Sequence, residues 1–188
     1  AIGQQRFSAL LDECGLTIPA FLEGGSPNYS VQAGSLMVRH AAGARQPVNL
    51  PEGVMRFHMT RRTLHPILTN DAASFFALDG DLRLVEFHSK ANALTDASME
   101  IVAAAAKDHG AGIIIHNDAQ HFSAGVDLNA FRRMIEAGQW DEIDGFLLRF
   151  QTAVAALKYV PVPVVGAPSG LAAGGGFEVL AHCDKLVV

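Results

Sequence analysis

Three consecutive glycines and one carboxylate form the stretch with the clearest chemical potential. The stretch is GLAAGGGFEVL, Gly170 to Leu180, and it predicts a turn after a buried strand and a helix from about Gly175. The first N–H groups of a helix have no partner within it, so they can hold negative charge, and glycines let another molecule approach them. A phosphate loop would need a lysine and a hydroxyl after the glycines, where Phe177 and Glu178 stand.

Glu178 limits the kind of charge that this turn can hold. A permanent anion would be repelled by the carboxylate, so the turn suits a charge that develops only during a reaction. The enolate oxygen of a thioester is such a charge, because preorganised N–H donors stabilise it while a carboxylate transfers the proton. A purely structural interpretation stays open, in which the glycines permit close helix packing and Glu178 favours the helix dipole.

A second small-residue turn strengthens the catalytic interpretation. HFSAGVDL, His121 to Leu128, also leads from a strand and loop into a helix, with the small residues Ala124 and Gly125 followed by Asp127. Aspartate is a favoured residue at the start of a helix. Two such turns can each direct one N–H group at the same oxygen.

The elements that position these turns follow an α/β order from about Ala72. ASFFALDGDLRLVEF predicts a hairpin that turns at Asp79 and Gly80, and Thr95 is a suitable N-cap for the helix that follows. AGIIIH and VPVVGA predict two buried strands. Between them, apolar residues at helical spacing predict two helices: Leu128, Phe131, Met134 and Ile135, then Ile143, Leu147, Phe150, Val154 and Leu157.

The part before Ala72 has a different character. Gln5 to Cys14 predicts a short helix closed by Gly15, and Ser26 to Asn70 is punctuated by prolines with no sustained period, which favours an irregular linker. We therefore expect residues 1–71 to be a linker and 72–188 to be an α/β domain. Because the chain starts at Ala1 and ends within a strand pattern, we expect it to be an internal piece of a longer polypeptide.

Composition narrows the class of protein. The 188 residues carry a net charge of −5, which argues against nonspecific binding to nucleic acid or anionic lipid. No apolar run is long enough to span a bilayer, and the N-terminus lacks a signal-peptide layout. The two cysteines, Cys14 and Cys183, lie far apart and in no metal-binding spacing, which indicates free buried thiols in a reducing cytoplasm.

Together the two turns resemble motifs of the crotonase (enoyl-CoA hydratase/isomerase) superfamily. The resemblance rests on HFSAGVDL and PVPVVGAPSGLAAGGGFEVLAHCD, and SKANAL, Ser89 to Leu94, is similar to the family's early CoA-contacting turn. It covers about Ala72 to Val188 and implies a partial crotonase-like ββα superhelix. The sequence around these motifs is most similar to the hydratase module of bacterial fused proteins in which a 3-hydroxyacyl-CoA dehydrogenase precedes the hydratase.

The resemblance also implies roles for individual residues. The backbone N–H groups of Val126 and Gly175 would form the oxyanion hole, and Glu178 matches the first of the hydratase's two catalytic glutamates. It implies further contacts with CoA or the acyl group from Lys90, Ala93, Ala124, Gly125, Asp127, Leu128 and Gly174.

The implied activity is addition of water to trans-2-enoyl-CoA in fatty-acid β-oxidation, with an acyl-CoA thioester as partner. The family's second glutamate lies beyond the strand that starts at Lys185, so we expect these 188 residues alone to be inactive. The resemblance also implies C-terminal helices that are absent here, so we expect apolar surface to be covered by formation of a homo-oligomer or by the segment Ser26 to Asn70. The resemblance implies no metal and no cofactor in this part, with NAD belonging to the dehydrogenase part. Alternatives are double-bond isomerisation, thioester hydrolysis, or a non-catalytic acyl-CoA-binding or assembly module, against which Glu178 argues.

Overall fold

A computed structural model describes residues 4–22, 28–32, 35–40, 44–49 and 56–188. The chain divides into two compact units, Ala1–Thr63 and Leu64–Val188. The division falls before the expected boundary at residue 71 because β4 (Pro66–Thr69) pairs with the first long strand of the second unit. All the residues of both glycine-containing turns belong to the second unit.

A six-stranded sheet forms the frame of the second unit. Its spatial order follows the chain order: β4, β5 (Ala73–Leu78), β6 (Leu82–Phe87), β7 (Gly112–His116), β8 (Val164–Ala167) and β9 (Lys185–Leu186). The first three strands are antiparallel, and the predicted hairpin turns through η3 (Asp79–Asp81), where Gly80 has φ +73°. From β6 onward the pairs are parallel, so the loops after β7 and β8 leave the sheet at the same edge.

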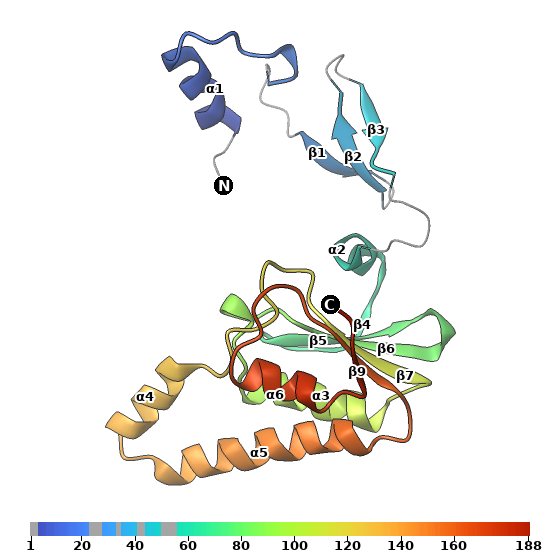
Figure 1. Cartoon of the computed structure of the whole chain (residues 1–188), viewed down its shortest axis with the longest axis vertical. Helices are drawn as coiled ribbons and strands as arrows, with labels where there is room; N and C mark the ends of the chain where they lie inside the picture. The colour runs from blue at the N-terminus through green and yellow to red at the C-terminus, as the bar shows by residue number, and fades with distance from the viewer. Residues whose placement is uncertain (1–3, 23–27, 33–34, 41–43, 50–55) are drawn as a thin grey trace. The chain divides into compact units, whose positions relative to one another are not determined.

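Helices cover one face of this sheet. Figure 1 shows α3 (Asp96–Lys107), α5 (Trp140–Tyr159) and α6 (Gly175–Ala181) along the same side, while α4 (Leu128–Glu136) extends away from it. Thr95 caps α3 as expected, in a capping box with Ser98. Every second side chain of a strand, and three or four of every seven side chains of a helix, face the shared core. The most deeply buried of these are Phe75, Val85, Phe87, Ile101, Val102, Ile113, Ile115, Val154, Leu157 and Val164.

The two helices between the turns lie where they were predicted, and Phe150, Val154 and Leu157 are buried as expected, but the rest of the predicted buried faces differs. On α5 the buried stripe includes Phe146 and Ala153, whereas Leu147 is 42% exposed. On α4 no residue is buried, and Leu128 is 74% exposed. The edge-on contact of Phe131 with Phe146, at 5.2 Å between ring centroids, joins α4 to α5. The apolar face of α4 therefore packs against α5 rather than against the sheet.

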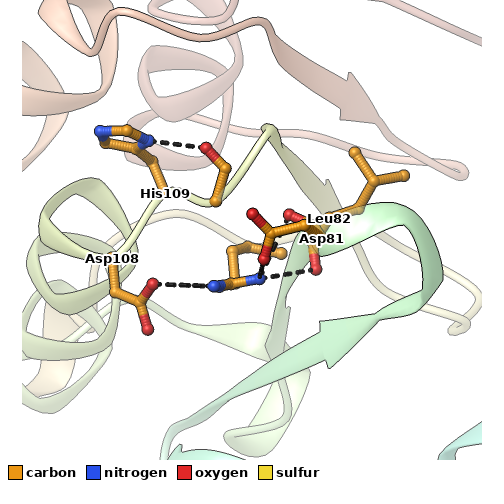
Figure 2. A network of polar contacts seen from close by, with 6 residues as sticks. Asp81, Leu82, Asp108 and His109 are labelled. Atoms are coloured by element: carbon orange, nitrogen blue, oxygen red, sulfur yellow. Dashed lines mark hydrogen bonds and ion pairs between the residues drawn. The ribbon is translucent and has the colours of Figure 1, made fainter.

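One arginine joins the hairpin to the loop before β7, as Figure 2 shows. Arg83 Nη1 donates to Asp81 Oδ1 (2.8 Å) and Nη2 donates to Asp108 Oδ1 (2.9 Å). The hydrogen bond to Asp81, and then that to Asp108, raises the pKa of Arg83 above its ordinary value. A side chain at Gly110 would strike the Asp81 carbonyl and Arg83, so glycine is required there. This cluster fixes the register between β6 and β7.

The first unit corrects the expectation of an irregular linker. Within Ser26–Asn70 the described residues include an antiparallel sheet of β1 (Tyr29–Gln32), β2 (Ser35–Arg39) and β3 (Arg45–Pro47), followed by α2 (Phe57–Thr60) and η2 (Arg61–Thr63). Pro47 is tolerated because it ends the edge strand β3, where its missing N–H costs little. Before the sheet come α1 (Gln4–Glu13), close to its expected bounds, and η1 (Ala20–Leu22). Residues 26–27, 33–34, 41–43 and 50–55 of that linker prediction lie outside the described residues.

Both cysteines are free, as expected, but only one is shielded. Cys14 is exposed after α1, which contradicts the expectation that it is buried, and Cys183 is half-buried after α6. In the part of the chain that the structure describes, no helix is both long enough and apolar enough to cross a membrane.

Candidate functional site

The three chemically suggestive segments lie side by side. Two isolated parallel bridges join them: Leu94 pairs with Val126, and Ser123 pairs with Ala172. The N–H of Leu94 donates to the Gly125 carbonyl (2.8 Å), and the N–H of Ser123 donates to the Leu171 carbonyl (3.1 Å). The turn around SKANAL, the HFSAGVDL loop and the glycine run therefore form a three-segment ladder, with the HFSAGVDL loop in the middle.

Further backbone bonds fix the register of this ladder. The N–H of Asp127 donates to the Leu94 carbonyl (3.2 Å) and the N–H of Ala173 donates to the Ser123 carbonyl (3.0 Å). Parallel neighbours β7 and β8 deliver the middle and third segments to one edge of the sheet, as the loops in Figure 1 show. The fold, rather than any local preference, brings the two predicted turns together.

Two buried polar side chains tie the middle segment to the first. Ser123 is fully buried, donates from Oγ to the Asn92 carbonyl (2.7 Å), and accepts from the Gly125 N–H (3.0 Å). Asn92, which is 8% exposed, donates from Nδ2 to the His121 carbonyl (3.0 Å). Buried polar groups without partners are costly, so these bonds specify one arrangement of the loop.

The turn that carries Lys90 has an unusual backbone. Within η4 (Lys90–Asn92), Ala91 has φ +56° and Asn92 has φ +51°. Asparagine tolerates this left-handed region, but alanine rarely adopts it, so the surrounding contacts must hold the turn. One such contact is the N–H of Ala124, which donates to the Ala91 carbonyl (3.1 Å). Lys90 itself is exposed.

The glycines allow the middle and third segments to approach closely. Gly125 has φ +87°, and a β-carbon there would lie 2.9 Å from the Ala173 carbonyl oxygen. A β-carbon on Gly176 would lie 2.6 Å from Ser123 Cβ. Both distances are shorter than a normal van der Waals contact of a carbon atom, so any larger residue would push the two segments apart.

The two expected oxyanion donors lie on segments that meet. A β-carbon on Gly175 would lie 3.2 Å from Val126 Cγ1 and 3.1 Å from the Phe150 ring, so Gly175 fits between these side chains. Among the described residues, neither the N–H of Val126 nor that of Gly175 donates a hydrogen bond to a protein acceptor. Gly175 is the first residue of α6, whose early N–H groups have no partner within the helix. Neither N–H group is therefore taken up by a protein acceptor in the part of the chain that the structure describes.

Glu178 lies in the first turn of α6, close in sequence to the Gly175 donor. Its side chain is exposed, and its own N–H donates to the Gly174 carbonyl (3.1 Å). Gly174 precedes the helix with φ +47°, which favours glycine at that position. A solvent-accessible carboxylate one turn from unpartnered N–H groups can exchange a proton with a bound substrate.

The remaining predicted contact residues occupy varied positions. Asp127 is the N-cap of α4 and accepts from the N–H groups of Asn129 (3.0 Å) and Ala130 (3.3 Å), so its carboxylate has a structural role. Leu128 and Ala124 are exposed, and Ala93 is half-buried between the first and middle segments. These residues belong to the first and middle segments of the ladder.

A cavity of about 330 Å³ opens beside the ladder. It is lined by all three segments, through Ala91, Asn92, Ala119, Gln120, His121, Ala124 and Leu171. A separate cavity of about 600 Å³ lies between α3 and α5, lined mainly by apolar residues and bordered by the ion pair of Arg149 with Asp96 (2.7 Å). In the described ranges, no group of three or more histidine, cysteine, aspartate or glutamate side chains is arranged to hold a metal ion.

Sequence reasoning missed the residues that hold the ladder. Asn92, Ser123 and His121 have contacts that cross between segments, and no spacing rule signals such partners in advance. The one available signal was asparagine in a predicted turn, because asparagine tolerates positive φ and bonds nearby backbone.

Comparisons with known proteins agree with this arrangement. The model of the family described as enoyl-CoA hydratase/isomerase matches residues 82–188. A "probable 3-hydroxyacyl-CoA dehydrogenase" of Bacillus subtilis is 27% identical over 195 residues, and the match covers 99% of this chain but 24% of that relative. The chain thus spans about a quarter of the length of this curated relative.

Solved structures extend the likeness to the fold. The enoyl-CoA hydratase of Bacillus halodurans matches with a TM-score of 0.56 at 19% identity, covering 61% of this chain and 49% of that chain. The enoyl-CoA hydratase of Bacillus anthracis matches with a TM-score of 0.55 at 22% identity, covering 61% of this chain and 46% of that chain. These matches confirm the expected crotonase-like fold, present in part.

Proposed function

The chain belongs to the enoyl-CoA hydratase/isomerase family, and from this premise we propose that it forms part of an enoyl-CoA hydratase module. The observation that carries the proposal is the meeting of Val126 and Gly175, whose N–H groups have no acceptor among the described residues. Two such donors on adjoining segments suit one oxygen that gains charge during a reaction.

The proposed reaction adds water to a trans-2-enoyl-CoA. The oxygen of water bonds to the β-carbon, the double bond shifts, and the thioester oxygen becomes enolate-like. The N–H groups of Val126 and Gly175 stabilise that oxygen, and one such donor is typically worth about 3–4 kcal/mol in the transition state. The attacking water loses one proton as its oxygen bonds to the β-carbon, and one proton is delivered to the α-carbon as the enolate returns to the thioester, so H and OH are added overall. Glu178 is proposed as one carboxylate that takes part in this proton transfer.

The CoA part of the substrate is assigned to the cavity beside the ladder. Lys90 is exposed on the adjoining strained turn, where its ammonium group can meet a phosphate, and Ala124 lines the cavity. Gly125, Ala93, Asp127, Leu128 and Gly174 are proposed as neighbouring contacts, with Asp127 acting through its cap of α4. Small side chains near the donors leave room for the thioester to approach the backbone.

The rest of the activity is proposed to require residues outside this chain. A hydratase of this family uses two glutamates, and Glu178 accounts for one, so the 188-residue chain alone should not turn over. The name of the Bacillus subtilis relative supports a 3-hydroxyacyl-CoA dehydrogenase in the same protein, and we propose that NAD would belong to that part. Fatty-acid β-oxidation would join the two reactions, and the free thiols support a cytoplasmic setting.

A hydration assay tests this proposal. The protein that contains this chain should convert crotonyl-CoA or a longer enoyl-CoA to its 3-hydroxyacyl product. The loss of the absorbance of the conjugated enoyl group measures this conversion. The 188-residue chain assayed in parallel should show no turnover above background. If the full protein instead hydrolyses the thioester or only shifts the double bond, the hydratase proposal is wrong and one of those reactions replaces it.

A further inference from the structure

The imidazole of His121 makes a bond that fixes its chemical form. The backbone N–H of Leu171 donates to His121 Nδ1, with 3.1 Å between the two nitrogens. A backbone N–H can only donate, so Nδ1 must be the acceptor and cannot carry a proton. In this arrangement the ring proton is therefore assigned to Nε2 rather than to Nδ1.

His121 contacts both outer segments of the ladder from the middle one. Its carbonyl accepts from Asn92 Nδ2 (3.0 Å) on the first segment, while its ring accepts from Leu171 on the third. The third segment is close packed here, because a β-carbon on Gly170 would lie 2.8 Å from His121 Nδ1. The His121 ring thus serves as the acceptor for the Leu171 N–H, just before the bridge between Ser123 and Ala172.

The third segment leads directly to one of the proposed donors. Leu171 begins the run that ends at Gly175. Two backbone bonds join this run to the middle segment: the N–H of Ser123 donates to the Leu171 carbonyl, and the N–H of Ala173 donates to the Ser123 carbonyl. His121 adds the contact nearest the start of this run among the described residues. Loss of the bond to His121 would leave the Leu171 N–H without its acceptor. It would also loosen residues 171–175, which set the position of Gly175.

We propose that His121 is a positioning residue of this site, which acts as the neutral Nε2–H tautomer by holding the Leu171 N–H and thereby the Gly175 donor. Its role in turnover rests on the proposed function, whereas its hold on the third segment does not. His121 is also one of the residues that line the cavity of about 330 Å³.

Ionisable side chains also occur on the segments around His121. The first segment carries Lys90, the middle loop carries Asp118, and Gly170–Ala172 carries no ionisable side chain. The backbone bond remains the feature that selects the tautomer.

Two variants separate this role from mere space filling. In His121→Asn the amide Oδ1 lies at about the same distance from the backbone as Nδ1 and can accept from Leu171. In His121→Gln the acceptor is carried one carbon further, where it matches Nε2 instead. Both remove the imidazole and both are polar, so each serves as the control for the other.

The first measurement uses NMR spectroscopy of the 188-residue chain. Long-range ¹H–¹⁵N correlation should show the Nε2–H tautomer for His121. Exchange of the Leu171 amide should be unchanged in His121→Asn and faster by about threefold to tenfold in His121→Gln. An Nδ1–H tautomer, or equal exchange in both variants, would overturn the proposal whatever the protein catalyses.

The second measurement addresses turnover in the protein that contains this chain. His121→Gln should lower kcat by roughly tenfold to a hundredfold with KM nearly unchanged, because a displaced donor weakens the transition state more than the bound substrate. His121→Asn should keep most of the activity. Equal loss in both variants would contradict positioning through Leu171. Absence of hydration in the wild-type protein would instead refute the proposed function and leave the NMR result to decide the positioning role.

Discussion

Gly175 meets Val126 so closely that a single β-carbon on Gly175 would lie 3.2 Å from Val126 Cγ1. The two residues belong to different loops, after β8 and after β7, and come together because these strands are parallel neighbours. In the proposed function, this meeting supplies two N–H donors from separate segments. The expectations below follow from that relationship and from the contacts that maintain it.

The carboxylate of Glu178 should be needed for turnover but not for binding. In the protein that contains this chain, Glu178→Gln should lower the rate of enoyl-CoA hydration by about 10²–10⁴-fold, because the amide keeps the shape but cannot accept a proton. Acyl-CoA affinity, measured by calorimetry, should change little. Glu100→Gln, an exposed change on α3, serves as the control. A Glu178→Gln variant with near-normal turnover would remove Glu178 from the mechanism.

The close approach of Gly176 to Ser123 should be sensitive to one added methyl group. Gly176→Ala would place a β-carbon 2.6 Å from Ser123 Cβ, so α6 must move away from the middle segment. We expect a loss of about 1–3 kcal/mol in the free energy of unfolding, measured with urea. Gly145→Ala, within α5, is the control, since its β-carbon meets only the mobile end of Arg149 and alanine favours helix. Equal stability of the two variants would contradict the tight contact.

Much of this arrangement was predictable because it depends on local signals. Gly175 as the first residue of a helix, Thr95 as an N-cap and the turn at Gly80 each follow from the chemistry of a few adjacent residues. The buried faces of α4 and α5 were less predictable. Periodicity shows that a helix has an apolar stripe but not what covers it, and Leu128 and Leu147 remain exposed.

The contacts of Ser123 and Asn92 were not predictable, since they join segments far apart in the sequence. The strands of the first unit were missed for a different reason. Tyr29–Gln32 and Arg45–Pro47 are too short to show a period, and prolines nearby suggested a linker. Only pairing with Ser35–Arg39 identifies them as strands.

The thiol of Cys183 should be unreactive near neutral pH. Burial, and then the negative charge of Asp184, raises the pKa of Cys183 from 9.0 to about 12. A thiol reagent at pH 8 should therefore modify exposed Cys14 quickly and Cys183 slowly, and denaturant should remove the difference. Rapid labelling of Cys183 in the folded chain would contradict its shielding.

The raised pKa of Cys183 determines whether the stability of the fold rises or falls with pH. Below about pH 9 the thiol is protonated in both states, so its contribution to folding is fully present. Between 9.0 and about 12 the unfolded chain loses the proton first, so the folded state loses stability as pH rises. Cys183→Ala should flatten that part of the stability curve relative to Cys14→Ala, as urea unfolding at several pH values can show.

Large apolar side chains on the described surface should promote self-association. Leu128, Trp140, Leu148 and Phe177 are between 59% and 74% exposed, and they lie on α4, α5 and α6. Covering such side chains with a second copy removes apolar area from water. Light scattering should therefore give a mass above the 20.0 kDa of one chain. A sharp monomer at micromolar concentration would contradict a homo-oligomer of this chain.

The most direct test of the account is a crystal structure of the protein that contains this chain with acetoacetyl-CoA bound. The account predicts that the thioester oxygen lies within about 2.7–3.2 Å of both the Val126 nitrogen and the Gly175 nitrogen. The CoA part should enter the cavity beside the ladder, near Lys90. A thioester oxygen bound elsewhere, or bonded to neither nitrogen, would contradict the proposed oxyanion hole and with it the mechanism.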